Sequence, residues 1–408
     1  MNAIQKYTAG AVVMGMSPTG LYAVRELGRA GVPVLGVSAS AQCANASKYL
    51  THPLKSIIEP NEEARLGKLC AAFKDAIEKA VLIPTSDQDI AFIARHKDIL
   101  AKFFVFQSSY ANGLAETILE KSTFYALCEK HGIAYPSFWE GARENLTGLI
   151  SHIKFPVVLK PSKIHAVKAE MAGVKAWALR DEKEYLNRIA ILPHGDTDWL
   201  VQEIVPGPES DISLYCAWIG KDQKPVQSFT AKKLRQFPPG FGSASLVAGH
   251  DEPQVKALSE KLMTAIGYEG IAATEFKYDR RDDMYKIIES NPRPSLWFSA
   301  STASGRTAAL AAYCALAGYE MPKAQDIVQG VQWRYGLKDL YSKLFYLRNR
   351  KFILPPPDLR AAGKPSRKIY AVFAWDDPRP AIGEVSANLR KLWQRILRKR
   401  GRADKGKS

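Results

Sequence analysis

Short apolar runs alternate with longer amphipathic stretches through the first part of the chain. The stretch 19–30, between the first two runs, has the pattern of a helix and ends at Gly31, a residue type that favours the left-handed turn after a helix. Nearly continuous apolar runs are typical of strands buried on both faces. Strands that alternate with helices predict a parallel, doubly wound sheet. The expected strands of this sheet are residues 11–14, 33–37, 81–84 and 103–106.

Two later segments, 270–277 and 286–293, predict a pair of antiparallel strands. The charged, turn-forming residues 279–283 separate them, so a hairpin is the natural interpretation. Side chains two residues apart leave the same face of a strand, which places Glu289 and Asn291 together.

This hairpin has the composition of a magnesium site. Glu275 from the first strand would join Glu289 and Asn291 from the second. Carboxylate and amide oxygens suit Mg²⁺ shared with substrate phosphates better than they suit Zn²⁺. Arg293 follows directly, where an anion beside the metal would lie. A solvated hairpin with ordinary surface acids is the alternative.

Five segments in a fixed order carry a wider resemblance. They are the helix start 119–124, residues 133–136, the strand 155–161, the segment 200–209 and the two hairpin strands. Over about residues 10–320 they resemble the ATP-grasp superfamily, and within it the carboxylate–amine ligases of the D-aspartate ligase type.

The resemblance implies an α/β and α+β fold. An N-terminal doubly wound parallel-sheet domain would be followed by a two-lobed ATP-grasp domain and a basic C-terminal extension. The expected boundaries are 1–112 for the Rossmann-like domain, 113–200 for the small lobe with its connecting helix, 201–330 for the large lobe with the metal strands, and 331–408 for the extension.

The resemblance also implies a reaction. ATP would phosphorylate a carboxylate, an amine would attack the acyl phosphate, and ADP and phosphate would leave. ATP and Mg²⁺ are then the cofactors, with two metal ions expected and Mn²⁺ as a substitute. Arg293 would hold the acyl phosphate, while Glu275, Glu289 and Asn291 hold the metal. The implied nucleotide contacts are Lys121 and Lys160 with the phosphates, Glu203, Ile204 and Val205 with adenine, and Glu209 with ribose.

Three cations and a Pro/Gly-rich end mark the segment 230–242. We interpret it as a substrate-side loop in which Lys232, Lys233 and Arg235 face phosphate or a substrate carboxylate. Lys232 and Arg235 therefore join Arg293 as candidate catalytic residues. A basic hairpin turn in solvent is the alternative.

One segment departs from the pattern of the family. After the strand that corresponds to the one carrying Lys160, these enzymes have a Gly- and Ser-rich loop. The backbone N–H groups of that loop close over the phosphates of ATP. Here the segment 162–173 has no glycine until its last residue, so Lys163, His165 and Lys168 would have to supply the donors. We expect an active ligase. A catalytically weak or inactive nucleotide-binding scaffold that acts through its basic C-terminus is the alternative.

The positive charge is concentrated at the C-terminal end. Residues 331–408 hold 20 Lys and Arg against 6 Asp and Glu, a net charge of +14, whereas the whole chain has +16. Residues 340–354 interleave aromatic and cationic side chains, and 389–400 would present an apolar stripe with Trp393 as a helix. This combination predicts contact with an anionic membrane surface. Nucleic acid is not expected, because nothing else resembles a nucleic-acid module. Docking on the protein's own surface is the alternative.

Other features predict a cytoplasmic protein, peripheral at the inner face of the membrane. The 5 cysteines are scattered without a metal-ligand spacing and are expected to be reduced. No apolar stretch reaches the roughly 20 residues that span a bilayer.

The expected substrates are a small carboxylate and a small amine, one of them an amino acid, and a homodimer is a further expectation. Residues 85–87 would border the carboxylate pocket or cap the next helix; the cap is favoured, and both can hold.

Overall fold

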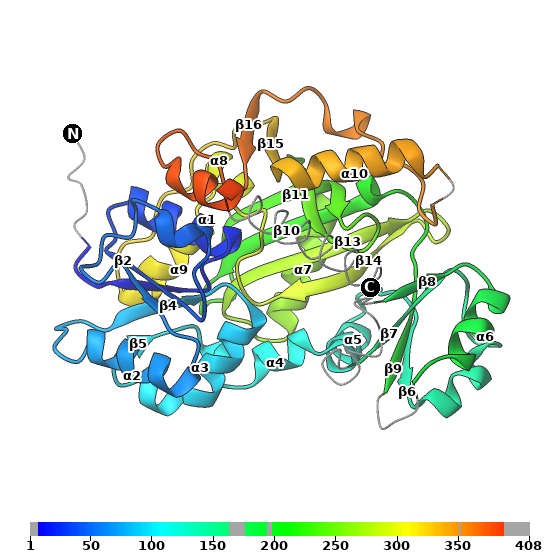
Figure 1. Cartoon of the computed structure of the whole chain (residues 1–408), viewed down its shortest axis with the longest axis horizontal. Coiled ribbons are helices and arrows are strands. Elements are labelled where there is room, and N and C mark those ends of the chain that lie inside the picture. Colours follow the sequence, from blue (N-terminus) through cyan, green and yellow to red (C-terminus); the bar gives the residue numbers. More distant parts are fainter. Residues whose placement is uncertain (1–6, 163–175, 194–197, 351, 387–408) are drawn as a thin grey trace, which may run out of the picture.

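The computed structural model describes residues 7–162, 176–193, 198–350 and 352–386. The N-terminal part, blue to cyan in Figure 1, forms a parallel sheet. Its five strands have the order β3-β2-β1-β4-β5, which confirms the predicted doubly wound sheet. Helix α1 (Pro18–Arg29) ends as expected, with Gly31 in the left-handed region at φ 89°. The remaining elements are β1 (Ala11–Met14), β2 (Val34–Ser38), β3 (Ser56–Ile58), α2 (Glu62–Ala72), β4 (Ala80–Pro84), α3 (Asp87–Leu100) and β5 (Phe104–Val105).

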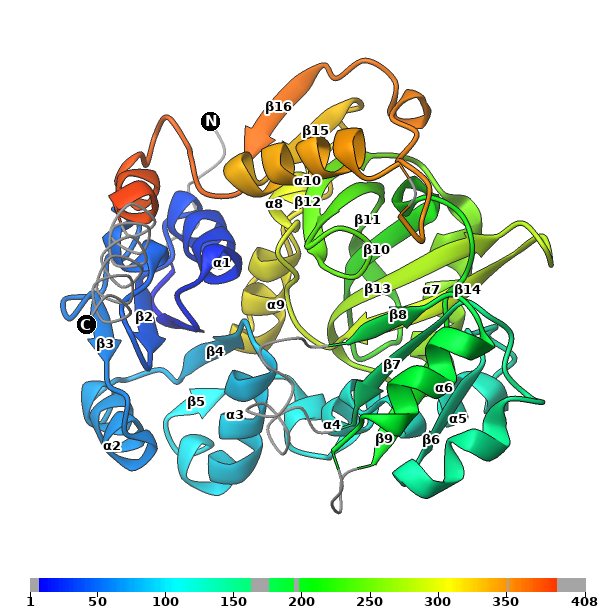
Figure 2. The ribbon, with the colours of Figure 1, turned by 45° about the vertical axis from the view of Figure 1, so that its right-hand side comes forward.

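A small lobe follows the N-terminal sheet. Helices α4 (Leu114–Leu119) and α5 (Lys121–Lys130) lead into a four-stranded antiparallel sheet in the order β6-β9-β7-β8. Figure 2 shows this lobe beside the β14 edge of the large sheet. Its elements are β6 (Phe138–Gly141), β7 (Val157–Pro161), β8 (Trp177–Leu179), α6 (Glu182–Ala190) and β9 (Trp199–Glu203).

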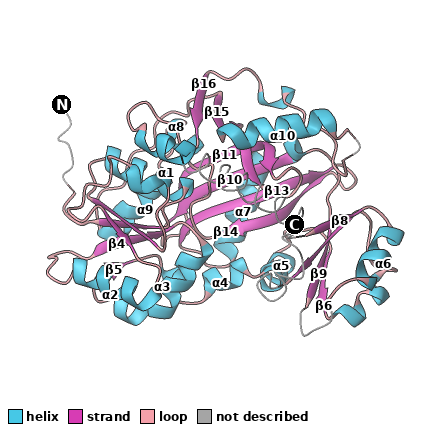
Figure 3. Ribbon diagram, in the orientation of Figure 1, coloured by secondary structure: helices cyan, strands magenta, loops and turns pink. Residues whose placement is uncertain are grey.

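The large lobe is a seven-stranded sheet in the order β14-β13-β10-β11-β12-β15-β16. Figure 3 shows the strands of this sheet in magenta. Its first strands are β10 (Ile212–Ile219), β11 (Pro225–Phe237), β12 (Ser243–Gly249), β13 (Gly270–Asp279) and β14 (Met284–Asn291). The predicted hairpin is confirmed as β13–β14. Helix α7 (Pro253–Ala265) packs on one face, and α9 (Ala308–Ala317) packs on the other and also against β4 and α1.

The basic C-terminal part adds two strands to this sheet, the second of which ends at Tyr370. Strands β15 (Val331–Arg334) and β16 (Arg367–Tyr370) extend the sheet, while α10 (Gly336–Arg348) lies against β11 and β12 (Figure 1). The chain then returns to the N-terminal domain, where Asp377 Oδ2 lies 3.0 Å from Nε of the buried Arg25. Among the described residues, no helix is long and apolar enough to cross a membrane.

Candidate active site

Three oxygen-bearing side chains share one face of the β13–β14 hairpin. Glu275 lies directly opposite Glu289 in the strand register, and Asn291 lies opposite Ala273, one step along the same face. Glu275 is buried. Glu289 lies in a recess, where protein surrounds it but solvent still reaches its side chain. The structure thus brings together the three residues expected to bind metal.

The two carboxylates differ in the charges around them. Burial raises the pKa of Glu275, and the negative charge of Glu289 adds to this rise against the attraction of Lys233. Burial acts on Glu289 in the same direction, but Lys121, Lys233 and Arg293 outweigh it and lower the pKa of that carboxyl. Neighbouring carboxylates repel each other when both are ionised, so this site favours a bound cation.

Two lysines reach these acids from outside the large sheet. Lys121 begins α5 and donates to the carbonyl of Ile288, while Lys160 lies on β7 of the small lobe. Burial lowers the pKa of Lys121 against the attraction of Glu289. Burial also lowers the pKa of Lys160, and the positive charge of Lys121 adds to that effect. Two ammonium groups close enough to repel each other would be stabilised by a polyanion between them.

The donor set fits a hard divalent cation that is bound together with a phosphorylated ligand. No group of three or more His, Cys, Asp or Glu side chains within the described ranges could hold a metal by itself. Glu275, Glu289 and Asn291 supply two carboxylates and an amide oxygen, which leaves coordination positions for phosphate oxygens and water. Mg²⁺ commonly binds in this way at phosphoryl-transfer sites.

The lysine of β11 that faces the acids is Lys233, not Lys232. Lys233 forms a buried ion pair with Glu275. Adjacent strand residues point to opposite faces, and Lys232 accordingly lies on the far face, where its Nζ is 3.1 Å from Glu252 Oε2 and 2.8 Å from Ser213 Oγ. The structure therefore places Lys233, and not Lys232, beside the acids, and the catalytic role expected for Lys232 stays a prediction.

Arg235, the other cation expected in this loop, holds α10 in place. Its Nε lies 2.7 Å from Oδ1 of Asp339 in a buried ion pair, and Asp339 also pairs with Arg334 at 3.2 Å. The guanidinium of Arg235 is therefore engaged at the base of α10, and the catalytic role expected for it stays a prediction.

Glu209 is likewise engaged within the protein. Its carboxylate is fully buried and accepts hydrogen bonds from the backbone N–H groups of Gln236 (2.9 Å) and Gly240 and from the hydroxyl of Tyr346 (2.8 Å). Burial raises the pKa of this carboxyl. Glu209 therefore has three partners within the protein, and its expected contact with ribose stays a prediction.

The segment that joins the two lobes is fixed by polar contacts. The carboxylate of Glu203, at the end of β9, pairs with Arg281. The side chains of Ile204 and Val205 are buried, and Lys277 Nζ donates to the carbonyl of Val205 at 2.7 Å. Burial lowers the pKa of Lys277 to about 8. The adenine contacts expected at residues 203–205 remain predictions.

Arg293 connects the acids to the N-terminal domain. Its Nε donates to Asp87 Oδ1 at 2.7 Å, and Asp87 is the first residue of α3. Ser86 caps that helix, because its Oγ accepts from the backbone N–H of Asp89 at 3.2 Å. The favoured cap is confirmed, and Asp87 in addition borders the acidic site through Arg293.

Sequence reasoning missed Lys277 and the pairing of Arg293 with Asp87. The only sequence signal for Lys277 is its position two residues after Glu275, which puts both on one strand face. Nothing local marks Asp87 as a partner of Arg293, since the contact depends on how two domains pack. The phosphate-side residues 163–175 and the tail 389–400 lie outside the described ranges.

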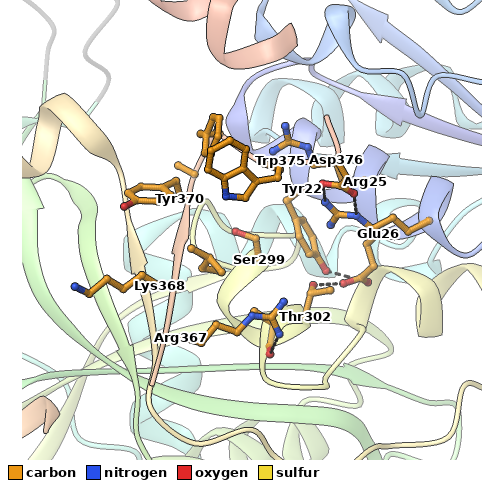
Figure 4. A pocket seen from close by; sticks show the side chains of 16 residues that line it. Tyr22, Arg25, Glu26, Ser299, Thr302, Arg367, Lys368, Tyr370, Trp375 and Asp376 are labelled. Carbon is orange, nitrogen blue, oxygen red and sulfur yellow. Dashed lines mark hydrogen bonds and ion pairs between the residues drawn. The ribbon is translucent and has the colours of Figure 1, made fainter. Parts of the chain in front are cut away.

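A cavity of about 560 Å³ lies between α1, α8 (Ser299–Ala303) and residues 367–376 (Figure 4). No residue of the acidic site described above lines this cavity. The carboxylate of Glu26 there accepts hydrogen bonds from the hydroxyl of Thr302 and from the backbone N–H groups of Ala309 (2.8 Å) and Leu310 (3.0 Å). Burial raises the pKa of Glu26 to about 7. Glu26 on α1 therefore accepts hydrogen bonds from free backbone N–H groups in the first turn of α9, and these bonds join two domains.

Comparison with known sequences gives one informative similarity. No protein-family model matches the chain. D-aspartate ligase from Enterococcus faecium (strain Aus0004) is 26% identical over 235 residues, which cover 54% of this chain and 55% of that protein. The chain thus matches its curated relative over about half of that relative's length.

Solved structures share the fold over most of the chain. N5-carboxyaminoimidazole ribonucleotide synthetase with ADP has a TM-score of 0.61 at 13% identity, covering 80% of this chain and 81% of that one. The ATP complex of the corresponding synthase from Aspergillus clavatus has a TM-score of 0.59 at 15% identity, with 79% and 80% covered. Biotin carboxylase from Campylobacter jejuni, in a β-γ-ATP complex, has 0.57 at 17% identity, with 81% and 75% covered.

These similarities show that the chain shares its fold with the carboxyaminoimidazole ribonucleotide synthetases and with biotin carboxylase. Its sequence is similar to that of D-aspartate ligase over about half of each chain.

Proposed function

We propose that the protein is an ATP- and Mg²⁺-dependent carboxylate–amine ligase, which forms an amide bond through an acyl phosphate. The observation that carries this proposal is the convergence of Lys121, Lys160 and Lys233 on the paired acids Glu275 and Glu289. Lysines and carboxylates that lie together suit a metal–triphosphate complex, because the lysines attract the negative phosphates and the carboxylates attract the positive metal ion. The similarity to D-aspartate ligase supports an amino acid as one substrate.

The reaction would run in two balanced steps. A carboxylate oxygen of the substrate attacks the γ-phosphorus of ATP, the bond from that phosphorus to the bridging oxygen breaks, and ADP leaves. The amine nitrogen then attacks the acyl carbon, the carbon–oxygen bond to phosphate breaks, and the nitrogen loses a proton. Lys121 and Lys160 would neutralise the phosphates, and Arg293 would hold the acyl phosphate.

The acids have a separate task in this proposal. Glu275, Glu289 and Asn291 would hold Mg²⁺, for which Mn²⁺ would substitute, in one or two sites. The bound metal supplies positive charge that offsets the charge on the transferring phosphoryl group. Lys233, paired with Glu275, would fix that carboxylate in a single orientation before nucleotide binds.

We also place the enzyme in the cytoplasm, at the inner face of the membrane, because of the cationic C-terminal part. Its residues 340–350 are described by the structure, whereas 389–400 lie outside the described ranges. A homodimer remains a prediction.

The experiment that tests the ligase proposal is an assay of ADP and phosphate release. A panel of amino acids, D-aspartate included, is supplied as carboxylates together with a panel of amines. We expect stoichiometric ADP and phosphate only where a carboxylate and an amine are both present. ATP binding without ADP release from any pair would instead favour the non-catalytic scaffold.

A further inference from the structure

Helix α10 has a polarity that is the reverse of an ordinary surface helix. Surface helices usually bury an apolar stripe and expose polar side chains. In α10 the residues that face the sheet and are buried include Asp339, Ser342 and Tyr346. The exposed fractions of the large apolar side chains are 67% for Leu337, 50% for Leu340, 55% for Tyr341, 43% for Leu344 and 62% for Leu347.

The buried polar face of α10 is fully engaged. Asp339 pairs with Arg235 at 2.7 Å. The Ser342 hydroxyl donates to the carbonyl of Gln236, and the Tyr346 hydroxyl donates to Glu209 at 2.8 Å. Rotation of the helix would leave Arg235 buried without its carboxylate partner and would remove one of the donors to Glu209, so the leucines stay on the outside.

The exposed side chains form one continuous stripe, here called the α10 stripe (Leu337, Leu340, Tyr341, Leu344 and Leu347). Steps of three and four residues place them on a single helix face. At its N-terminal end the stripe borders a recess of about 920 Å³, which Leu337 and Tyr341 line together with Tyr370 and Val385. Figure 1 shows α10 and β16 along the same edge of the molecule.

The exposed charges on α10 and directly after it are positive, while Glu384 lines the recess at its N-terminal end. Lys343, Arg348 and Arg350 are exposed on or directly after the helix. Asp339 is the one acidic residue between 336 and 350, and it is buried in its ion pair. An apolar stripe between cations complements a bilayer surface of anionic lipids, which offers acyl chains beneath phosphates. A second copy of the same face would bring like charges together.

We propose that α10 docks on an anionic lipid surface. The side chains of the α10 stripe enter the boundary between headgroups and acyl chains, and Lys343, Arg348 and Arg350 contact lipid phosphates. This inference goes beyond the ligase proposal and does not depend on it, because no residue of the acidic site takes part.

Sedimentation of the full-length protein with lipid vesicles tests this surface. Vesicles of phosphatidylglycerol and phosphatidylcholine are compared with vesicles of phosphatidylcholine alone. The test variant carries Leu340→Ser, Leu344→Ser and Leu347→Ser. The matched control carries Ile77→Ser, Ile99→Ser and Leu186→Ser, which replace apolar side chains exposed by 103%, 44% and 37% on other elements.

We expect the wild-type protein and the control to bind the anionic vesicles and to dissociate as salt is raised. The test variant should bind at least about tenfold more weakly, because three leucines no longer enter the lipid. A second variant with Lys343, Arg348 and Arg350 changed to Glu leaves the leucines in place and should also lose binding. Unchanged melting temperatures show that each variant is folded.

Three results would overturn the proposal. The first is equal vesicle binding by the wild-type protein and by both variants. The second is loss of binding only when the chain is ended after Ser386, which would assign the contact to the remaining tail. The third is a wild-type dimer without lipid that the leucine variant converts to a monomer, which would make the α10 stripe a contact between two copies.

Discussion

Arg293 Nε lies 2.7 Å from Asp87 Oδ1, in an ion pair that joins residues 206 positions apart in the chain. Arg293 follows β14 closely, and its positive charge also helps to lower the pKa of Glu289. One guanidinium therefore links the first turn of α3 to the acids of the large lobe. The N-terminal domain thereby takes part in shaping the acidic site.

The Asp87→Asn substitution should separate this role from a role in stability. The pair is partly exposed, so the free energy of unfolding should change by less than about 1 kcal/mol. Arg293 would lose its orientation, and we expect kcat to fall by about tenfold with a smaller change in the KM for ATP. Asp98→Asn, on an exposed turn of the same helix, is the control. Steady-state kinetics in which both variants match the wild type would show that Asp87 does not position Arg293.

The Glu289→Gln substitution removes one of the two paired carboxylates from the β13–β14 hairpin. The side chain lies in a solvent-accessible recess and contributes little packing, so the fold should persist. Turnover should fall by at least about a hundredfold, because charge on the transferring phosphoryl group is no longer compensated. ADP release and thermal melting are measured together, with Glu182→Gln on the exposed first turn of α6 as the control. Turnover near that of the wild type would remove Glu289 from the site.

A comparison of Lys232 with Lys233 tests which of the two lysines acts at the acidic site beside Glu275. Lys233→Met leaves Glu275 buried without its partner, which should cost about 3–5 kcal/mol of unfolding free energy and also abolish turnover. Adding Glu275→Gln to that variant should restore stability but not turnover. Lys232→Met should keep most of the turnover per folded molecule, since its partner Glu252 lies on the other face. Turnover lost in Lys232→Met alone would reverse the assignment.

The hairpin that carries the acids was predictable because its signals are local. A turn-forming segment and period-two spacing fix which side chains share a face, and Glu275, Glu289 and Asn291 meet as expected. Local pattern also shows that Lys232 and Lys233 must face opposite ways. It does not show which one faces the acids, because that depends on the pairing of β11 with β10 and of β10 with β13.

The C-terminal part was less predictable for a physical reason. Sequence reasoning assumes that apolar residues turn inward, and α10 does the opposite. Its buried Asp339 and Tyr346 occupy Arg235 and Glu209, which were expected to meet substrate and ribose. Both side chains therefore have partners on a distant helix that no local pattern indicates, and their expected contacts with substrate and ribose stay predictions.

The stability of the protein should depend on pH through Glu26. Its pKa is raised by burial from an ordinary value of 4.5 to about 7 in the folded protein. The folded state therefore holds a proton that the unfolded state has released, so stability is lost as pH rises through this range. The total loss should be on the order of 3 kcal/mol between about pH 4.5 and pH 7.

Chemical denaturation of wild type and Glu26→Gln across this range isolates the contribution of Glu26. The amide does not titrate, so the difference in unfolding free energy between the two proteins should change with pH as described. Glu63→Gln, an exposed acid on α2, should follow the wild type. A difference that stays constant with pH would mean that Glu26 titrates as an ordinary carboxyl.

The most direct test of the ligase mechanism follows one oxygen atom. The carboxylate substrate is labelled with ¹⁸O, and the phosphate released during turnover with ATP and amine is analysed by mass spectrometry. An acyl phosphate transfers one carboxylate oxygen to phosphate, so each phosphate released should carry a single ¹⁸O. Phosphate without label, formed while ATP is consumed and amide appears, would contradict the acyl-phosphate account.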